Sequence, residues 1–366
     1  MLSGRAQSRP NFVLMSFNLN NITRANVKGL SPYSSARDEY VSDGSTMIFL
    51  DANENPFENG VNRYPDPQQR SLKAILADQK GVDEANILLG NGSDEVLDLL
   101  FRAFCEPKQD NIITLPPTYG MYKVLSGINL VENREVLLTN DFQPNIPEIK
   151  KAIDVNSKLL FICSPNNPTG NSFSTNLIEE LLNSFNGLVV IDEAYVDFSP
   201  EESWTSKLAD FPNLIVTQTL SKAYGMAGIR LGICIASTEI IAVLNKIKPP
   251  YNVNQLTQDK AITRVLDKAS VKNEVNEILN ERTKLIDALN TISFVETIYP
   301  TDANFVLIKV DDATLRYHQL LAKGVVVRNR TTQPLCQNTL RFTVGTSKEN
   351  NSVITALKAI SNSYEK

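Results

Sequence analysis

The chain has 366 residues, of which 42% are hydrophobic, and its formal net charge at pH 7 is −5. This length and apolar content are sufficient for one large domain and one smaller domain, each with its own core. The acidic balance argues against a general nucleic-acid or membrane-binding surface, and no apolar run is long enough to span a bilayer. We therefore expect neither a nucleic-acid partner nor a membrane partner.

The cysteine and histidine content narrows the chemistry further. Four cysteines are scattered without metal or redox spacing: Cys105, Cys163, Cys234 and Cys336. They indicate reduced thiols in a cytoplasmic protein, and we expect no leader peptide. The single histidine, His318, lies in a predicted surface helix. This nearly excludes Ser-His-Asp hydrolysis and histidine-based metal sites, so we expect no metal and favour a lysine mechanism.

In the first half of the chain, helical and strand patterns of hydrophobic residues alternate. Residues 1–20 follow neither a helical nor a strand pattern and are left unassigned. Beyond Pro67, helical patterns at 69–79, 94–104 and 175–184 alternate with strands ending near Gly90, Leu115, Cys163, Ile191 and Thr217. This alternation predicts an α/β fold with a mostly parallel sheet and helices on both faces.

The second half changes character after a Lys-Ile-Lys-Pro-Pro-Tyr segment at 246–251. A long helical pattern over 254–289 is followed by predicted strands at 305–310, 324–328 and 340–344, with helices beginning near 312 and 348. This predicts a smaller α+β domain. We divide the chain into 1–50, an N-terminal arm and part of the small domain; 51–270, the large domain; and 271–366, the C-terminal small domain.

A lysine occupies an unusual position between two predicted strands of the large domain. Thr219 to Gly232 reads T-L-S-K-A-Y-G-M-A-G-I-R-L-G, and Lys222 stands on the turn among small and apolar residues. A lysine held partly away from water is a candidate for Schiff-base chemistry.

Polar motifs also follow two other predicted strands. Ser-Pro-Asn-Asn-Pro-Thr-Gly begins at residue 164, and Asp-Glu-Ala-Tyr begins at residue 192. Both lie at carboxyl ends of strands, where open α/β sheets bind their ligands. An acid that emerges from a strand of Val and Ile is costly to bury unless a cation or a hydrogen-bond donor meets it.

Each of these residues, taken alone, also has an ordinary structural explanation. Asp192 is compatible with a helix N-cap and Asn167 with an Asx turn. Tyr195 is compatible with a core aromatic residue, Lys222 with a surface lysine and Arg230 with half of an ion pair. Only their order along the chain favours a shared site.

The ordered set resembles the fold-type-I, pyridoxal-phosphate-dependent aminotransferases, from about residue 31 to the C-terminus. The resemblance implies a large domain with a mostly parallel sheet of the seven-stranded type, which binds pyridoxal 5'-phosphate, and a smaller α+β domain. It implies that Lys222 binds the cofactor as an imine and moves the substrate proton. It implies that Asp192 keeps the ring nitrogen protonated, and that Tyr195 and Asn167 hydrogen-bond the phenolic oxygen.

A glycine turn before a predicted helix belongs to the same resemblance. Ser93 is predicted to be the N-cap of the 94–104 helix, and the backbone N–H groups of Ser93, Asp94 and Glu95 would cradle the cofactor phosphate. Tyr119, in Pro-Thr-Tyr-Gly-Met-Tyr, matches the aromatic residue that stacks on the pyridine ring; packing beneath a loop is the alternative.

Three more residues complete the implied phosphate site, and a fourth implies a dimer. Arg230 lies eight residues beyond the lysine, so its fork can reach the phosphate together with Ser221 and Thr219. Tyr64 matches the tyrosine that reaches the cofactor phosphate of the partner subunit, which implies a homodimer with twofold symmetry.

The chain has L-S-P-Y-S-S-A-R from residue 30 and L-D-A-N-E-N-P-F from residue 50, and near its other end V-R-N-R from residue 327 and L-R-F-T-V-G-T from residue 340. These motifs look like those of the histidinol-phosphate aminotransferases. The resemblance places Tyr33, Asn53, Arg328 and Arg341 around a substrate that carries a phosphate. Arginine suits a phosphomonoester because its fork is planar and always charged. As alternatives, the two arginines are paired surface residues and Asn53 is a turn residue. Arg330 is an additional cation that can share the phosphate.

The implied reaction is the exchange of an amino group between L-histidinol phosphate and 2-oxoglutarate, which gives imidazole acetol phosphate and glutamate in histidine biosynthesis. Two alternatives remain on this scaffold: a lyase like the threonine-phosphate decarboxylases, and an aromatic amino acid aminotransferase. A cofactor-binding sensor is disfavoured because no basic DNA-binding segment stands before the fold.

Overall fold

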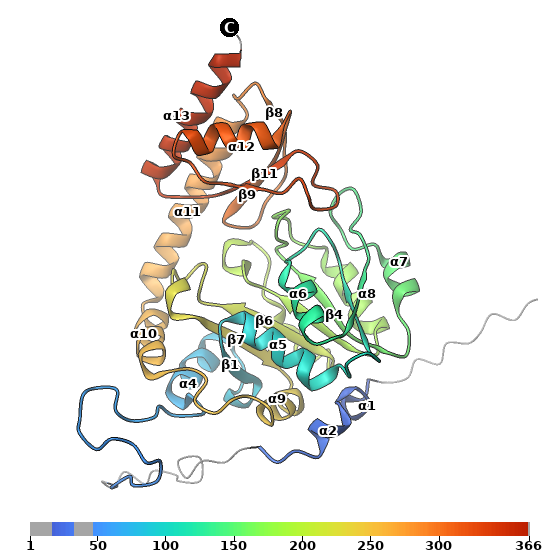
Figure 1. Cartoon of the computed structure of the whole chain (residues 1–366), viewed down its shortest axis with the longest axis vertical. Helices are drawn as coiled ribbons and strands as arrows, with labels where there is room; N and C mark the ends of the chain where they lie inside the picture. The colour runs from blue at the N-terminus through green and yellow to red at the C-terminus, as the bar shows by residue number, and fades with distance from the viewer. Residues whose placement is uncertain (1–16, 33–46, 365–366) are drawn as a thin grey trace, which may run out of the picture.

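The computed structural model describes residues 17–32 and 47–364, which are organised around two β-sheets. The larger sheet has seven strands in the order β1-β7-β6-β5-β4-β2-β3, and the smaller has four in the order β10-β11-β9-β8. Figure 1 shows the small sheet and its helices at the top of the molecule, above the large sheet. The predicted division into a larger α/β part and a smaller α+β part is thus visible in the arrangement of the sheets.

The large sheet is mostly parallel, as predicted. Its strands are β1 (Ile87–Asn91), β2 (Asn111–Thr114), β3 (Glu132–Glu135), β4 (Ser157–Cys163), β5 (Leu188–Asp192), β6 (Leu214–Thr219) and β7 (Leu231–Ala236). Strands β2 to β6 pair in parallel, and only β7 runs antiparallel to its neighbours β6 and β1. The central strands are buried along their whole length because helices cover both faces, which explains their continuous runs of Val, Ile and Leu.

Helices form two layers around this sheet. One layer contains α4 (Arg70–Lys80), α7 (Ile146–Ala152), α8 (Thr175–Ser184) and α10 (Gln255–Leu266), and the other contains α5 (Ser93–Phe104), α6 (Met121–Ile128) and α9 (Thr238–Asn245). Short 3-10 turns connect the elements: η1 (Glu84–Asn86), η2 (Val196–Phe198), η3 (Trp204–Lys207) and η4 (Ala227–Ile229). The predicted helices at 69–79, 94–104 and 175–184 are therefore confirmed to within a residue.

Two helix boundaries differ from the prediction. Gly92, at φ 79°, is the N-cap of α5, so Ser93 is the first helical residue and not the cap. Only glycine adopts this backbone conformation without strain. The long helical stretch expected over 254–289 is divided into two helices. Asp267 ends α10 and accepts a hydrogen bond from the Ser270 N–H (3.2 Å) at the start of α11 (Lys268–Leu289).

The small sheet is antiparallel and lies beside α11, which runs upward from the large sheet in Figure 1. Its elements are β8 (Val295–Ile298), β9 (Phe305–Val310), α12 (Ala313–Ala322), β10 (Arg328–Asn329), β11 (Thr339–Thr343) and α13 (Ser347–Tyr364). The strand predicted over 324–328 was wrong for 324–327. The N–H groups of Gly324 and Val325 bond to the last carbonyls of α12 instead, so they cannot join the sheet.

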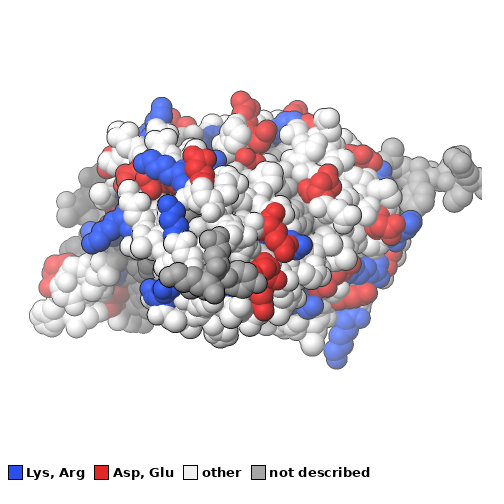
Figure 2. Space-filling model, turned by 90° about the horizontal axis from the view of Figure 1, so that it is seen from above, with Lys and Arg blue, Asp and Glu red and all other residues white. Residues whose placement is uncertain are grey.

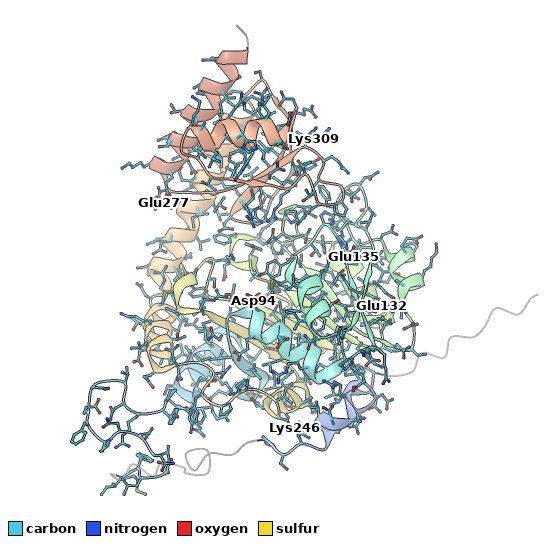
Figure 3. The ribbon with its side chains drawn as sticks, viewed as in Figure 1. Asp94, Glu132, Glu135, Lys246, Glu277 and Lys309 are labelled. Atoms are coloured by element: carbon cyan, nitrogen blue, oxygen red, sulfur yellow. The ribbon has the colours of Figure 1, made fainter. Side chains whose placement is uncertain are left out.

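The described part of the N-terminal arm contacts the large sheet layer. Its helices are α1 (Leu19–Ile22) and α2 (Ala25–Lys28). The Arg24 N–H donates to the Ala103 carbonyl of α5 (3.0 Å), and Lys246, labelled in Figure 3, donates to the Lys28 carbonyl (2.8 Å). The boundaries at residues 50 and 270 stay predictions.

The surface of the described residues carries charges of both signs. Figure 2 shows lysine and arginine side chains interspersed with aspartate and glutamate on the face seen from above. None of the helices in residues 17–32 and 47–364 combines the length and the hydropathy needed to cross a membrane.

Candidate active site

Lys222 lies on the turn that joins β6 to β7. The turn is held by backbone bonds from the Leu220 N–H to the Leu231 carbonyl (3.2 Å) and from the Met226 N–H to the Leu220 carbonyl (2.9 Å). The Lys222 ammonium stands 5.6 Å from the centre of the Tyr195 ring. Burial, followed by the nearby charge of Arg341, lowers the pKa of Lys222. A lysine in this state is more readily deprotonated than one in water.

Asp192 is the last residue of β5 and is only 3% exposed. Its carboxylate accepts hydrogen bonds from the Tyr122 hydroxyl (2.7 Å) and the Ala194 N–H (3.3 Å). Within the described residues it forms no ion pair. Burial raises the pKa of Asp192, and the bond from Tyr122 opposes that rise. A buried carboxylate without a basic side chain at its oxygens is suited to a cationic ligand group.

The side-chain amide of Asn167, on the loop after β4, contacts both the loop after β5 and the small sheet. It donates to the Tyr195 hydroxyl (3.3 Å), and its carbonyl oxygen accepts a hydrogen bond from the Arg341 guanidinium of β11. Arg341 lies 5.0 Å above the Phe305 ring, which packs edge-on against Tyr195. Burial raises the pKa of Tyr195, and the charge of Arg341 opposes that rise. The small sheet therefore places an arginine against the loops that follow β4 and β5 of the large sheet.

The start of α5 lies against Arg230. The Gly92 N–H donates to the Arg230 carbonyl (2.9 Å), and the Arg230 guanidinium is 3.4 Å from the Asp94 carboxylate, which also accepts from the Tyr119 hydroxyl (3.0 Å). Figure 3 labels Asp94 beneath the small sheet. A Cβ at Gly92 would come within 2.5 Å of the Arg230 guanidinium. The positive φ of Gly92 favours glycine at this position, and the missing Cβ lets the guanidinium lie close to the start of α5.

The remaining residues of the predicted phosphate site border the same turn. The Thr219 hydroxyl lies 3.0 Å from the Ser221 hydroxyl and accepts from the Ser221 N–H (3.1 Å). The Glu95 carboxylate accepts a hydrogen bond from the Asn252 amide (2.8 Å) on a neighbouring loop. Glu95 would therefore contribute to an anion site through its backbone N–H. The residues predicted to bind the phosphate thus lie at the start of α5 and on the β6–β7 connection, which are joined by the hydrogen bond between Gly92 and Arg230.

Asn53 and Tyr64 lie at a different place from the residues around Lys222. They lie on the segment before α4, which projects from the body in Figure 1, and they line a pocket of about 590 Å³. The Tyr64 ring stacks on Tyr251 with a centroid distance of 4.6 Å. Tyr33 lies outside the described residues.

Comparison with known proteins identifies the family. The model of the family described as "Aminotransferase class I and II" matches residues 49–357. The chain is 64% identical to a histidinol-phosphate aminotransferase of Flavobacterium johnsoniae, over 94% of this chain and 99% of that protein. It is 52% identical to a histidinol-phosphate aminotransferase of Bacteroides fragilis, over 93% and 98%. The chain belongs to the histidinol-phosphate aminotransferase family. It is an enzyme, and its class is the aminotransferases.

Solved structures share the fold of this aminotransferase. The histidinol-phosphate aminotransferase of Clostridium acetobutylicum superposes with a TM-score of 0.77 at 25% identity, covering 83% of this chain and 92% of that one. The Sinorhizobium meliloti protein, solved in complex with pyridoxal-5'-phosphate, gives 0.76 at 23% identity, covering 82% and 83%. An L-threonine-O-3-phosphate decarboxylase of Porphyromonas gingivalis gives 0.71 at 23% identity, covering 84% and 92%. The last two similarities, both at 23% identity, show a shared fold and nothing more.

The donor set of this aminotransferase fits pyridoxal phosphate. The buried carboxylate of Asp192 suits a protonated ring nitrogen, and the lysine with a lowered pKa suits an aldehyde. The glycine-lined start of α5, with Arg230 beside it, suits a phosphate.

One residue of the site was missed by sequence reasoning. Tyr122 is buried, donates to Asp192 and stacks on Phe161 with a centroid distance of 4.7 Å. Tyr122 lies in the first turn of α6, and Tyr119, just before that helix, meets its ring edge-on with a centroid distance of 5.6 Å. Because Tyr122 and Asp192 are 70 positions apart, only the fold shows that they meet.

Proposed function

We propose that this aminotransferase exchanges an amino group between L-histidinol phosphate and 2-oxoglutarate, giving imidazole acetol phosphate and glutamate, with pyridoxal phosphate as its cofactor. One observation carries the choice of a phosphorylated substrate. Arg328 and Arg341 stand opposite each other in the β10–β11 register, beside the lysine site, and neither has an acidic partner among the described residues. The names of relatives at 52–64% identity support the same substrate.

The ring of the cofactor would lie between Asp192, Tyr119, Tyr195 and Asn167. Bound pyridoxal phosphate supplies a reactive aldehyde and a ring that accepts electrons. Asp192 would hold the ring nitrogen in its protonated form, because a buried carboxylate is stabilised by a cation at its oxygens. Tyr195 and Asn167 would donate to the phenolic oxygen, and Tyr119 would cover one face of the ring.

The phosphate of the cofactor would be bound at the start of α5. Backbone N–H groups at a helix N-terminus and an arginine fork are both suited to an anion. The residues that we propose for it are Ser93, Asp94 and Glu95 through their backbone, and Thr219, Ser221 and Arg230 through their side chains.

Lys222 would move the substrate proton. Its lowered pKa increases the fraction of neutral amine, which can take a proton from the substrate Cα and return it elsewhere. The position of Lys222 on a turn between two strands allows its side chain to swing without disturbing the sheet.

The two substrates would use one anion site in turn. Arg341 would bind the phosphate of L-histidinol phosphate and, in the second half of the cycle, a carboxylate of 2-oxoglutarate, with Arg328 beside it. Tyr33 and Asn53 are proposed to complete the site. This alternation predicts ping-pong kinetics.

We propose a cytoplasmic homodimer in which Tyr64 reaches the cofactor phosphate of the partner subunit. The segment before α4 exposes large apolar side chains, among them Ile48 (84% exposed), Leu50 (86%) and Phe57 (79%). A second copy of the chain would cover them. The four buried thiols support a reducing compartment. Sedimentation of purified protein as a monomer at micromolar concentration would reject the dimer.

Product analysis tests the proposed reaction. Purified holoenzyme is mixed with 2-oxoglutarate and one donor at a time: L-histidinol phosphate, L-phenylalanine or L-threonine-O-3-phosphate. We expect glutamate and imidazole acetol phosphate with the first donor and little glutamate with the others. Release of carbon dioxide from the threonine derivative would favour a lyase, and faster glutamate formation from phenylalanine would favour an aromatic aminotransferase.

A further inference from the structure

The outer ladder of the small sheet carries three arginines. Arg328 on β10 stands directly opposite Arg341 on β11. The ladder continues for one more residue pair, because the Arg330 N–H donates to the Thr339 carbonyl (2.9 Å). Alternate residues of a strand point to the same face, so Arg330 shares the face of Arg328. Three positive charges therefore project from one side of a short ladder.

No carboxylate among the described residues neutralises this group through an ion pair. The Arg330 Nε and the Arg341 Nε are buried without a hydrogen-bond acceptor, and the Thr331 hydroxyl on the same loop is buried without a partner. Burial, followed by the charge of Arg328, lowers the pKa of Arg330, and burial together with Arg330 lowers that of Arg341 to about 10. Like charges facing each other destabilise a sheet, and a bound anion would offset this repulsion.

The arginine group faces the reacting end of the site. Arg341 donates to Asn167, and the charge of Arg330 acts on the Tyr195 hydroxyl. We propose that Arg330 is a third anion-binding residue, which makes the site selective for a doubly charged phosphate monoester over a singly charged carboxylate. The inference rests on the proposed function, because it assigns a residue to the substrate of that reaction.

The selectivity follows from the number of donors. A carboxylate has two oxygens and is satisfied by one bidentate arginine, which Arg341 supplies. A phosphate monoester has three terminal oxygens and about twice the charge, so it can accept from a second and a third fork. Removing Arg330 should therefore affect the phosphorylated donor much more than an amino acid donor.

The variant Arg330→Met tests this in the holoenzyme, with each half-reaction measured separately. We expect kcat/KM for L-histidinol phosphate to fall roughly 10- to 100-fold, the loss of one charge-assisted hydrogen bond, and kcat/KM for L-glutamate to fall less than about threefold. Arg330→Lys keeps the charge without the fork and should give an intermediate loss. Lys309→Met is the matched control, because it removes a charge from the same sheet at a residue, labelled in Figure 3, that pairs with Glu296 at the surface (2.9 Å). It should change neither rate more than about twofold.

Equal losses for both donors, or no loss for either, would overturn the role of Arg330. Calorimetric titration of the holoenzymes with inorganic phosphate separates this from failure of the proposed function. If the wild type does not use L-histidinol phosphate, the proposed function fails, yet Arg330→Met should still bind phosphate at least about tenfold more weakly. Equal phosphate affinity in the wild type and in Arg330→Met would reject the inference. If Arg330→Met does not fold, the same comparison with Arg330→Lys decides, and unchanged affinity there rejects it.

Discussion

The variant Asp192→Asn should make the apoenzyme more stable while it makes the enzyme inactive. Asp192 is buried at the end of β5, without an ion pair among the described residues, and its pKa is raised by burial. At any pH above this raised pKa the apoenzyme carries an ionised carboxylate that water would solvate better. Asparagine has nearly the same shape: its carbonyl oxygen can accept from the Ala194 N–H in place of Oδ1, and its NH2 group, in place of Oδ2, can donate to the oxygen of the Tyr122 hydroxyl.

The size of the effect follows from these contacts. Burying an unpaired ion costs several kcal/mol, and hydrogen bonds to a charged group return about 1.5–3 kcal/mol each. Two such bonds leave a net cost, consistent with the raised pKa. We expect the amide to raise the free energy of unfolding by about 1–2 kcal/mol, which corresponds to a rise of about 1–3 °C in Tm for a chain of this size.

The pH dependence has a definite sign. A folded pKa above the unfolded value means that protonated Asp192 favours the fold, and that this contribution disappears as pH rises through the raised pKa. The Tm advantage of Asp192→Asn over the wild type should therefore grow as pH rises through the raised pKa of Asp192 and should shrink as pH falls below it. Calorimetric scans of both apoenzymes between pH 5 and 8 measure it, with the exposed Asp210→Asn as the control.

Addition of pyridoxal phosphate completes the test. The wild type should gain more Tm from the cofactor than the variant, because a protonated ring nitrogen supplies the cation that Asp192 lacks. An apo Asp192→Asn protein that melts at or below the wild-type temperature at pH 7.5 would refute this reasoning. An equal gain from the cofactor in both proteins would refute the assignment of Asp192 to the ring nitrogen.

Three further predictions follow from the site. Lys222→Ala should lower turnover by at least about 1,000-fold, and peptide mapping after borohydride reduction should find the cofactor adduct at this residue in the wild type only; an adduct elsewhere contradicts the assignment. Arg341→Lys removes the fork that reaches Asn167, so kcat/KM for both substrates should fall about 10- to 100-fold in steady-state assays, and wild-type values would contradict it. Gly232→Ala places a Cβ 2.3 Å from the Ser93 nitrogen, so it should cost about 1–3 kcal/mol in stability and reduce cofactor retention on dialysis, whereas an unchanged Tm and full retention would show that the backbone yields.

The local patterns of the chain were sufficient for the fold class. Alternating strand and helix periods predicted the mostly parallel sheet, because a strand covered on both faces must be apolar throughout. The same patterns gave wrong boundaries where the end of a helix or strand depends on hydrogen bonds to neighbouring residues. Residues 324–327 have strand-like composition, yet their first N–H groups complete α12. Gly92 replaces Ser93 as the cap of α5 because the chain turns there with a positive φ.

The order of motifs along the chain was also enough to nominate Lys222, Asp192 and Asn167, since each follows a predicted strand and parallel strands end at one edge of a sheet. Which side chains meet was decided by the tertiary structure alone. Arg341 reaches Asn167 across 174 residues, and Tyr122 reaches Asp192 across 70. Periodicity shows the face on which a residue lies but not which residue it contacts. Only the tertiary structure therefore shows that Arg328, Arg330 and Arg341 lie together without an acidic partner among the described residues, and that Asp192 is buried without a cation.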